Sequence, residues 1–217
     1  LLSPAQSAIL EVGAGSGKLA CDLLKALEQQ NRLPDGYYIL EISSELRARQ
    51  HARVQQECPH LANRVHWLDT LPTAFNGIVV GNEVLDAMPA HLIVWGDEQR
   101  LERGVRSQGS DFYWQDAPIQ NPALDEIAHS IATQYALPTP YLSEINLANR
   151  GFMRSLAQSL QSGWIFLFDY GFSAREYYHP QRNQGTLMCH YQHHSHTDPL
   201  TLVGIQDITS HVDFTAI

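Results

Sequence analysis

The chain has 217 residues, which suffices for one large domain, or one domain with an insertion, around a substantial core. Its 14 basic and 23 acidic residues give a formal net charge of -9, and no run of Lys or Arg occurs, which argues against a nucleic acid partner. No apolar stretch approaches the roughly 20 residues that cross a bilayer, so we expect no membrane partner.

The three cysteines, Cys21, Cys58 and Cys189, are odd in number and widely spaced, without a C-x-x-C pair. This pattern is typical of reduced thiols and predicts a cytoplasmic compartment. The chain begins at Leu1 without an initiator Met, and its first predicted strand starts almost at once. We therefore expect the native N-terminus to lie upstream, and the sequence does not predict the targeting of the protein.

The first predicted strand, Ala8 to Val12, leads into three glycines at positions 13, 15 and 17 and then into a helix-compatible sequence. Glycines at such a junction allow a sharp turn, and they bring peptide N–H groups close to a ligand at the helix N-terminus. A dinucleotide fingerprint needs a glycine where Lys18 stands, so the segment fits E-x-G-x-G-x-G better, with Glu11 at the strand end. The alternative is a glycine-rich turn that only connects strand and helix.

A predicted helix with apolar positions at helical spacing ends at the turn Pro34-Asp35-Gly36, and a second strand, Tyr37 to Leu40, closes on Glu41. Ser43 or Ser44 can cap the next helix, which runs towards Glu57. An acidic residue at the end of the second strand is placed to accept both hydroxyls of a ribose, in NAD or in S-adenosylmethionine. The alternative is a solvated Glu before a helix N-terminus.

Two further strands are predicted at 64 to 68 and 77 to 80, and they end at Asp69 and at Asn82-Glu83. Together with Glu11 and Glu41, these residues would lie at the carboxyl edge of one parallel sheet, where doubly wound α/β folds bind ligands. The sequence therefore predicts a single α/β domain with its site at this edge.

The alternation of predicted strands and helices changes after this core. A β-hairpin is predicted at 91 to 95 and 101 to 105, with a third strand at 112 to 114, and an amphipathic helix at 122 to 135. A helix from about Ile145 to Leu160 and a strand from Trp164 to Phe168 return to the core. We thus divide the chain into a core, residues 8 to 90 and 145 to 171, an insertion, residues 91 to 144, and a loop-rich C-terminal part, residues 172 to 217.

Four histidines in the C-terminal part, His190, His193, His194 and His196, raise the possibility of a zinc site. They lack an accompanying Cys or Glu pair at a familiar ligand spacing. We therefore expect no metal, and interpret them as solvent-facing or hydrogen-bonded residues of a loop.

Several separated segments resemble the MidA-like methyltransferases, a family that includes the mitochondrial protein-arginine methyltransferase that assists assembly of respiratory complex I. The matching segments are ILEVGAGSGKLA (9 to 20), LEISSELRARQ (40 to 50), GNEVLDAMPAHL (81 to 92), LERGV (101 to 105), FLFDYGF (166 to 172), GTLMCHYQHH (185 to 194) and DITSHVDF (207 to 214). The glycine loop is shared by many methyltransferases, whereas the N-E-x-x-D-A-x-P, D-Y-G and H-V-D-F segments are more specific.

The resemblance implies a Rossmann-like methyltransferase fold, a mostly parallel doubly wound sheet that is truncated at both ends, with S-adenosylmethionine as the cofactor. It also implies a protein substrate, methylated on arginine, and the mitochondrial matrix as the compartment in a eukaryote. The family has further helix and strands after the H-V-D-F segment, so we expect the sheet to lack its final strands unless residues 172 to 217 supply them. The cofactor-binding residues that it implies are Glu11, Gly13, Ala14, Gly15, Gly17, Glu41, Ile42, Asp69 and Asn82.

A protonated arginine must be polarised by a carboxylate before one of its nitrogens can attack a methyl group. The catalytic candidates are Glu83 and Asp86, which follow the fourth strand, and Glu144 is a weaker third. Each of them has a structural alternative, a buried acid paired with Arg or a backbone N–H. Two other functions remain open, a non-catalytic assembly factor that binds a partner protein and a nucleotide-dependent oxidoreductase.

Overall fold

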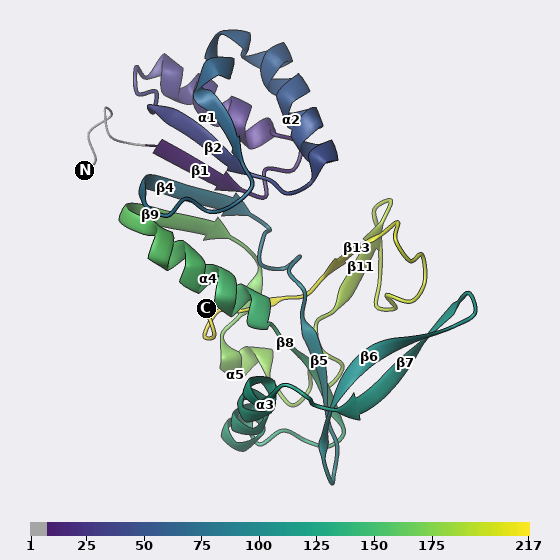
Figure 1. Cartoon of the computed structure of the whole chain (residues 1–217). Helices are drawn as coiled ribbons and strands as arrows, with labels where there is room; N and C mark the ends of the chain where they lie inside the picture. The colour runs from purple at the N-terminus through teal and green to yellow at the C-terminus, as the bar shows by residue number, and fades with distance from the viewer. Residues whose placement is uncertain (1–7) are drawn as a thin grey trace. The chain divides into compact units, whose positions relative to one another are not determined.

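In the computed structural model, which describes residues 8–217, five parallel strands form one sheet in the order β3-β2-β1-β4-β9 (Figure 1). The strands are β1 (Ala8–Val12), β2 (Gly36–Leu40), β3 (Val65–Leu68), β4 (Phe75–Asn82) and β9 (Leu160–Phe168). Since β2 and β4 flank β1 on its two sides, the direction of winding reverses beside β1. Ligands of doubly wound folds bind at such a point, outside the carboxyl ends of the strands. The predicted α/β class with a parallel sheet is confirmed.

Two helices connect the first three strands. Helix α1 (Lys18–Gln29) begins directly after the glycine loop, and α2 (Ser44–Glu57) is followed by the 3-10 helix η2 (Pro59–Arg64). Ser43 is the N-cap of α2, because its hydroxyl accepts a hydrogen bond from the N–H of Leu46 at 3.3 Å. Apolar side chains of these helices and of β1 to β3 form a buried core, which includes Ile9, Ala20, Leu24, Tyr37, Ile39, Val54 and Val65.

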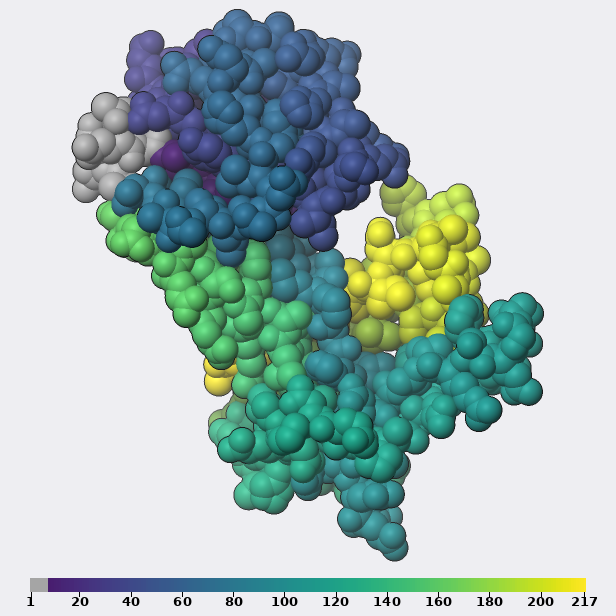
Figure 2. Space-filling view, viewed as in Figure 1, coloured from purple at the N-terminus to yellow at the C-terminus, as the bar shows by residue number. Residues whose placement is uncertain are grey.

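A second, antiparallel sheet has the order β7-β6-β5-β8. Its strands are β5 (His91–Trp95), β6 (Arg100–Gln108), β7 (Asp111–Pro118) and β8 (Tyr141–Ile145). One face of this sheet packs on helix α3 (Pro122–Tyr135), in a core that includes Ile93, Trp95, Tyr141, Leu124, Ala128 and Ile131. The predicted hairpin, its third strand and the helix at 122 to 135 are confirmed. In the space-filling view the β6–β7 hairpin, teal, projects from the rest of its unit (Figure 2).

The structure corrects the start of one helix and adds one strand. Ile145, predicted to begin a helix, is the last residue of β8, and the helix α4 (Leu147–Ser159) starts two residues later. Strand β8 was not predicted, because its five residues follow Pro140 closely and pair with β5, almost 50 residues earlier in the chain. The local sequence around Ile145 suits either a helix start or a buried strand, and the tertiary pairing selects the strand.

The prediction of a loop over residues 172 to 217 is wrong for several short elements. They are β10 (Gly171–Phe172), α5 (Ala174–Tyr177), β11 (Met188–Tyr191), β12 (His194–His196), β13 (Asp207–Thr209) and β14 (Val212–Asp213). The strands form two small sheets, β10-β14 and β12-β11-β13, and none of them joins the five-stranded sheet. Strands this short carry almost no periodic signal, so their long-range partners determine them.

The described chain divides into two compact units. The first ends at Val84 and resumes over Met153–Asp169, and the second consists of Leu85–Phe152 and Tyr170–Ile217. The predicted insertion and the predicted C-terminal part therefore fall mostly in one unit. That both units make one domain stays a prediction. Among residues 8–217, no helix is both long enough and apolar enough to span a membrane.

Candidate functional site

Strand β1 ends at a buried carboxylate. Glu11 is almost fully buried, and its Oε2 accepts a hydrogen bond of 2.7 Å from the hydroxyl of Tyr37 on β2. Burial raises the pKa of Glu11 to about 6, although the hydrogen bond from Tyr37 acts in the opposite direction. Glu11 lies beside Ile39 of β2 and Val80 of β4 in the register of the sheet, one residue before the end of β1.

The glycine loop that follows has a left-handed backbone at all three predicted glycines, with φ of +66° at Gly13, +50° at Gly15 and +76° at Gly17. The N–H of Gly17 donates to the carbonyl of Ala14 at 2.8 Å, which closes the turn. A Cβ at Gly13 would lie 3.0 Å from Val84, and a Cβ at Gly17 would lie 3.1 Å from Gln50. The positive φ, together with these close approaches, disfavours a side chain at both positions.

Gly15 differs from its neighbours, because a Cβ built there meets no atom within 4 Å. The middle of the loop thus faces open space, with the N-terminus of α1 directly behind it. Such a loop lets a ligand approach the bare backbone, and the partial positive charge of the helix N-terminus favours an anionic group. The loop has the open shape that the sequence predicts, and its role as a ligand cradle stays a prediction.

Strand β2 leads to the second carboxylate. Glu41 is buried, and its Oε1 accepts from the N–H of Ser43 at 2.9 Å, while its Oε2 accepts from the amide of Gln50 at 3.0 Å. Each carboxylate oxygen keeps lone-pair capacity for a further donor. The next residue, Ile42, is 90% exposed, so a large apolar side chain stands free beside this carboxylate.

Sequence reasoning missed Gln50, which connects the loop to Glu41. Its Nε2 also donates to the carbonyl of Gly15 at 2.9 Å, and its Oε1 accepts from the indole N–H of Trp67 at 2.8 Å. The side chain is fully buried, so these three bonds fix its orientation. The only sequence signal is its place inside the LEISSELRARQ segment.

Arg47 was missed as well. Its Nη2 donates to the carbonyls of Glu41 and Leu68 and, at 2.8 Å, to Oδ1 of Asp69. The guanidinium thereby holds the ends of β2 and β3 together. The Asp69 carboxylate is itself mostly exposed, as a ligand contact requires.

Strand β4 ends at Asn82, and the side chains of Asn82 and Glu83 are both exposed. Glu83 has φ of +50°, which is uncommon for a residue with a side chain. Its N–H donates to the carbonyl of Phe168 at 2.8 Å, and the next N–H, of Val84, donates to the Asp169 carboxylate at 3.1 Å. These bonds hold the strained turn in place, which is a feature found at functional sites.

The five-stranded sheet therefore has its predicted polar strand ends at one edge. The other two catalytic candidates, Asp86 and Glu144, belong to the second unit. Asp86 is buried, and its Oδ1 has no hydrogen-bond partner among the described residues.

Glu144 is in a different environment. Its carboxylate accepts from the N–H and hydroxyl of Thr186, from the N–H of Leu187 and from the hydroxyl of Tyr177, all within 3.1 Å. With this many donors bound, the carboxylate has a structural role, and it anchors residues 186 and 187 to β8. Burial, and then the charge of Glu144, raise the pKa of Tyr177 well above its usual range.

Within the described residues, no three His, Cys, Asp or Glu side chains gather in a way that could hold a metal ion. Two of the four C-terminal histidines lie at the ends of β12, and His190 lies in β11. Cys21, Cys58 and Cys189 are free and buried.

Comparisons with known proteins identify the family of this chain. A family model described as "Putative S-adenosyl-L-methionine-dependent methyltransferase" matches residues 1–217. A native crystal structure of an uncharacterized protein from Burkholderia thailandensis is 44% identical, with a TM-score of 0.90 over 97% of this chain and 56% of its own. No curated protein matches the chain.

A second structure from Burkholderia thailandensis, of a member of the same superfamily, was solved with S-adenosyl-homocysteine bound. It is 44% identical, with a TM-score of 0.89 over 97% of this chain and 54% of its own. This chain thus spans about half the length of both relatives.

Proposed function

We propose that this chain, which belongs to the family of S-adenosyl-L-methionine-dependent methyltransferases, binds S-adenosylmethionine at the carboxyl edge of its five-stranded sheet and methylates a protein, on arginine. The observation that carries the proposal is the connection between the open glycine loop and Glu41 through the buried amide of Gln50. A glycine loop alone occurs in many folds. Its rigid connection to an acidic residue at the next strand end suits a ligand with an anionic end and a ribose.

The residues at this edge fit the cofactor in chemistry. Gly13, Ala14, Gly15 and Gly17 would hold its aminocarboxypropyl end, with Glu11 behind them, because the space at Gly15 is open and the helix N-terminus attracts a carboxylate. Glu41 would accept the ribose hydroxyls. The exposed side chain of Ile42 would pack on the adenine, with Asp69 and Asn82 as polar neighbours.

The cofactor supplies an electrophilic methyl group on a sulfonium centre, and the protein has to align a nucleophile with it. Glu83 is our first candidate for this task, because its exposed carboxylate lies at the end of β4 on a strained backbone. A carboxylate there would polarise a guanidinium and compensate the charge that develops on it. Asp86 is the second candidate, since the unpaired oxygen of its buried carboxylate is available to a donor.

The proposed compartment is the cytoplasm, or the mitochondrial matrix in a eukaryote. The protein substrate and the arginine target are supported by the resemblance to MidA-like enzymes and by the chemistry of Glu83. An alternative function, a non-catalytic assembly factor, is favoured by one observation, the exposed Phe112, Tyr113 and Trp114 of β7. Aromatic residues are enriched at interfaces between proteins.

The test has two arms. Calorimetry measures the affinity of the chain for S-adenosylhomocysteine and for NADH, and we expect binding of the first only. The second arm incubates the protein with tritiated S-adenosylmethionine and a cell extract, and mass spectrometry locates the label. Methylarginine supports the proposal, whereas label on another residue refutes arginine as the target. Cofactor binding without any labelled product would favour the assembly factor, and binding of NADH alone would overturn the methyltransferase proposal.

A further inference from the structure

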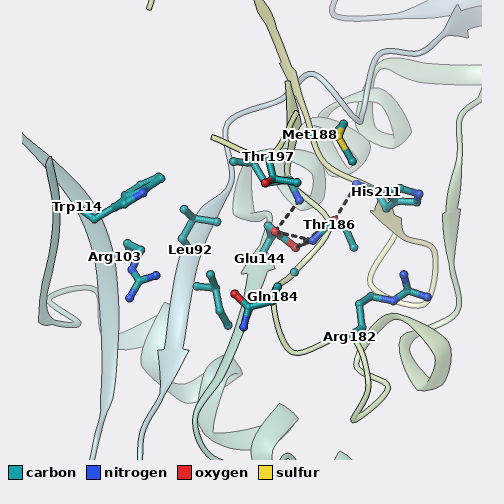
Figure 3. A pocket seen from close by; sticks show the side chains of 13 residues that line it. Leu92, Arg103, Trp114, Glu144, Arg182, Gln184, Thr186, Met188, Thr197 and His211 are labelled. Carbon is teal, nitrogen blue, oxygen red and sulfur yellow. Dashed lines mark hydrogen bonds between the residues drawn. The ribbon is translucent and has the colours of Figure 1, made fainter. Parts of the chain in front are cut away.

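The antiparallel sheet of the second unit has a cavity of 540 Å³ on one face (Figure 3). In the register of the sheet, Leu92 lies opposite both Arg103 and Glu144, so these three side chains share a face. Leu142 and Trp114 lie two residues from positions on that same face. The other face is the one that packs on α3. The cavity thus occupies the face of the sheet that α3 leaves free.

The remaining wall of the cavity consists of Arg182, residues 184 to 188, Thr197 and His211. This wall is attached to the sheet through Glu144, whose carboxylate accepts the hydrogen bonds of Thr186 and Leu187 described above. The negative charge of Glu144 is therefore used within the protein. Glu144 is also the single carboxylate among the lining residues.

The remaining polar groups of the lining are mainly donors. Arg182 makes only long contacts with Glu176, 3.4 Å to its carbonyl and 3.5 Å to its carboxylate, and its guanidinium lies 4.1 Å above the ring of Phe172. The side chains of Gln184 and Thr197 make no hydrogen bond to another described residue. Within the described part of the chain, Arg182 thus has one carboxylate partner, at 3.5 Å. Burial, and next the charge of Arg182, lower the pKa of His211.

The apolar part of the lining consists of Leu92, Leu142, Leu187 and Met188 and of the indole of Trp114, which is 38% exposed. Figure 3 shows Trp114 and Arg182 on opposite sides of the cavity. A cavity of this volume lies within the range, about 300 to 1,000 Å³, of sites that bind small molecules. Apolar side chains beside a guanidinium whose carboxylate partner is at the long distance of 3.5 Å match a ligand that has an apolar body and an acidic head.

We propose that this cavity is a second binding site, independent of the cofactor edge, for a carboxylate carried on an apolar body. Arg182 pairs with the carboxylate, Gln184 and Thr197 add hydrogen bonds, and the apolar body packs against Leu92 and Trp114. The same chemistry occurs in a free aryl or alkyl carboxylic acid and in an acidic residue next to an aromatic one in a protein.

The probes are 3-phenylpropionate and its neutral analogue 3-phenylpropanamide, whose binding to the chain is measured by calorimetry. We expect the acid to bind at least tenfold more tightly than the amide, and Arg182→Met to remove that preference. Arg106→Met is the matched control and should leave the preference unchanged. Arg106 lies on the β6–β7 hairpin, opposite Tyr113, on the face that points away from Arg103 and Trp114 and from the cavity. Trp114→Ala should weaken both probes equally, since it removes only apolar contact.

Four results would overturn the proposal. They are no binding of the acid, equal binding of acid and amide, an unchanged preference in a folded Arg182→Met variant, and displacement of the acid by S-adenosylhomocysteine. The comparison of acid and amide on the unaltered chain needs no variant, so it remains decisive if Arg182→Met fails to fold. The peptide acetyl-Glu-Phe-amide, with acetyl-Gln-Phe-amide as its control, separates the two sources. A Glu peptide that binds more tightly than 3-phenylpropionate assigns the site to a protein ligand, and a weaker one assigns it to a small acid.

Discussion

The amide Nε2 of Gln50 donates hydrogen bonds to two acceptors, the carboxylate of Glu41 at 3.0 Å and the carbonyl of Gly15 at 2.9 Å. One buried side chain thus fixes the distance between the proposed ribose acceptor and the middle of the glycine loop. Because a pre-organised site loses less conformational entropy on binding, we infer that Gln50 is a positioning residue of the cofactor site.

Replacing Gln50 by Leu should lower the affinity for S-adenosylhomocysteine by about tenfold, which corresponds to about 1.4 kcal/mol. Gln56→Leu on the exposed side of the same helix is the control and should leave the affinity unchanged. A double-mutant cycle with Glu41→Gln, measured by calorimetry, tests whether Gln50 acts through Glu41. If Gln50 acts by orienting Glu41, the two losses are non-additive, and strictly additive losses would refute this role.

Gly15→Val tests the open space over the loop. Gly109, in the turn of the β6–β7 hairpin, has a similar φ of +64° and also has no atom within 4 Å of a built Cβ. The two substitutions therefore cause the same kind of backbone strain, and only the first obstructs the proposed cofactor. We expect at least a tenfold loss of S-adenosylhomocysteine affinity for Gly15→Val and none for Gly109→Val. Equal affinities of both variants, measured by calorimetry, would show that the loop is not the cradle.

Glu11 should make stability depend on pH. Its pKa is about 6 in the folded chain against an ordinary value of 4.5, so between these values the folded state holds a proton that the unfolded state has lost. Stability therefore falls as the pH rises through this range, by about 2 kcal/mol in total. Urea unfolding between pH 4 and 7.5 measures the unfolding free energy of the unaltered chain and of Glu11→Gln. The difference between the two isolates Glu11, because the contributions of the other titrating groups cancel. A difference that is flat with pH would contradict the buried state of Glu11.

A substitution at Gly185 tests whether the Glu144 carboxylate anchors residues 186 and 187 in the second unit. A Cβ there would lie 2.3 Å from Oε1 of Glu144, whereas Gly204, with a similar positive φ, has no atom within 4 Å of a built Cβ. Gly204→Ala should cost about 1 to 2 kcal/mol of unfolding free energy through the backbone alone. Gly185→Ala should cost at least about 2 kcal/mol more, because it displaces a buried carboxylate from its donors. Denaturant titration compares the two variants, and equal costs would argue against the anchoring role of Glu144.

The sequence predicted those parts of the site that depend on neighbouring residues. The glycine loop after β1, the Ser43 cap and the acidic residue after β2 are local patterns, and the structure has all three. Gln50 was missed because its partner Gly15 lies 35 residues away and because α2, SELRARQHARVQQE, is polar along most of its length. A buried amide in such a helix cannot be distinguished from its exposed neighbours by periodicity.

Long-range partners also explain why the short strands and the role of Glu144 were not predicted in the second half of the chain. Strands β10 and β14 have two residues each and pair about 40 positions apart, so no local window contains both. Glu144 was considered for catalysis from its charge alone. Its donors at Thr186 and Leu187, 42 and 43 residues later, give it a structural role that only the folded chain reveals.

The last prediction separates catalysis from cofactor binding at Glu83. Glu83→Gln keeps the size of the side chain and one acceptor, but it removes the charge that a cationic transition state requires, so methyl transfer should fall about 10²-fold or more. The affinity for S-adenosylhomocysteine should stay within twofold, because the proposed cofactor contacts are on other residues. Glu126→Gln, an exposed carboxylate of α3, is the control. Scintillation counting measures transfer to the labelled protein, and calorimetry measures affinity. Loss of both would place Glu83 in the cofactor site or the fold, and retention of both would leave Asp86→Asn as the next variant to test.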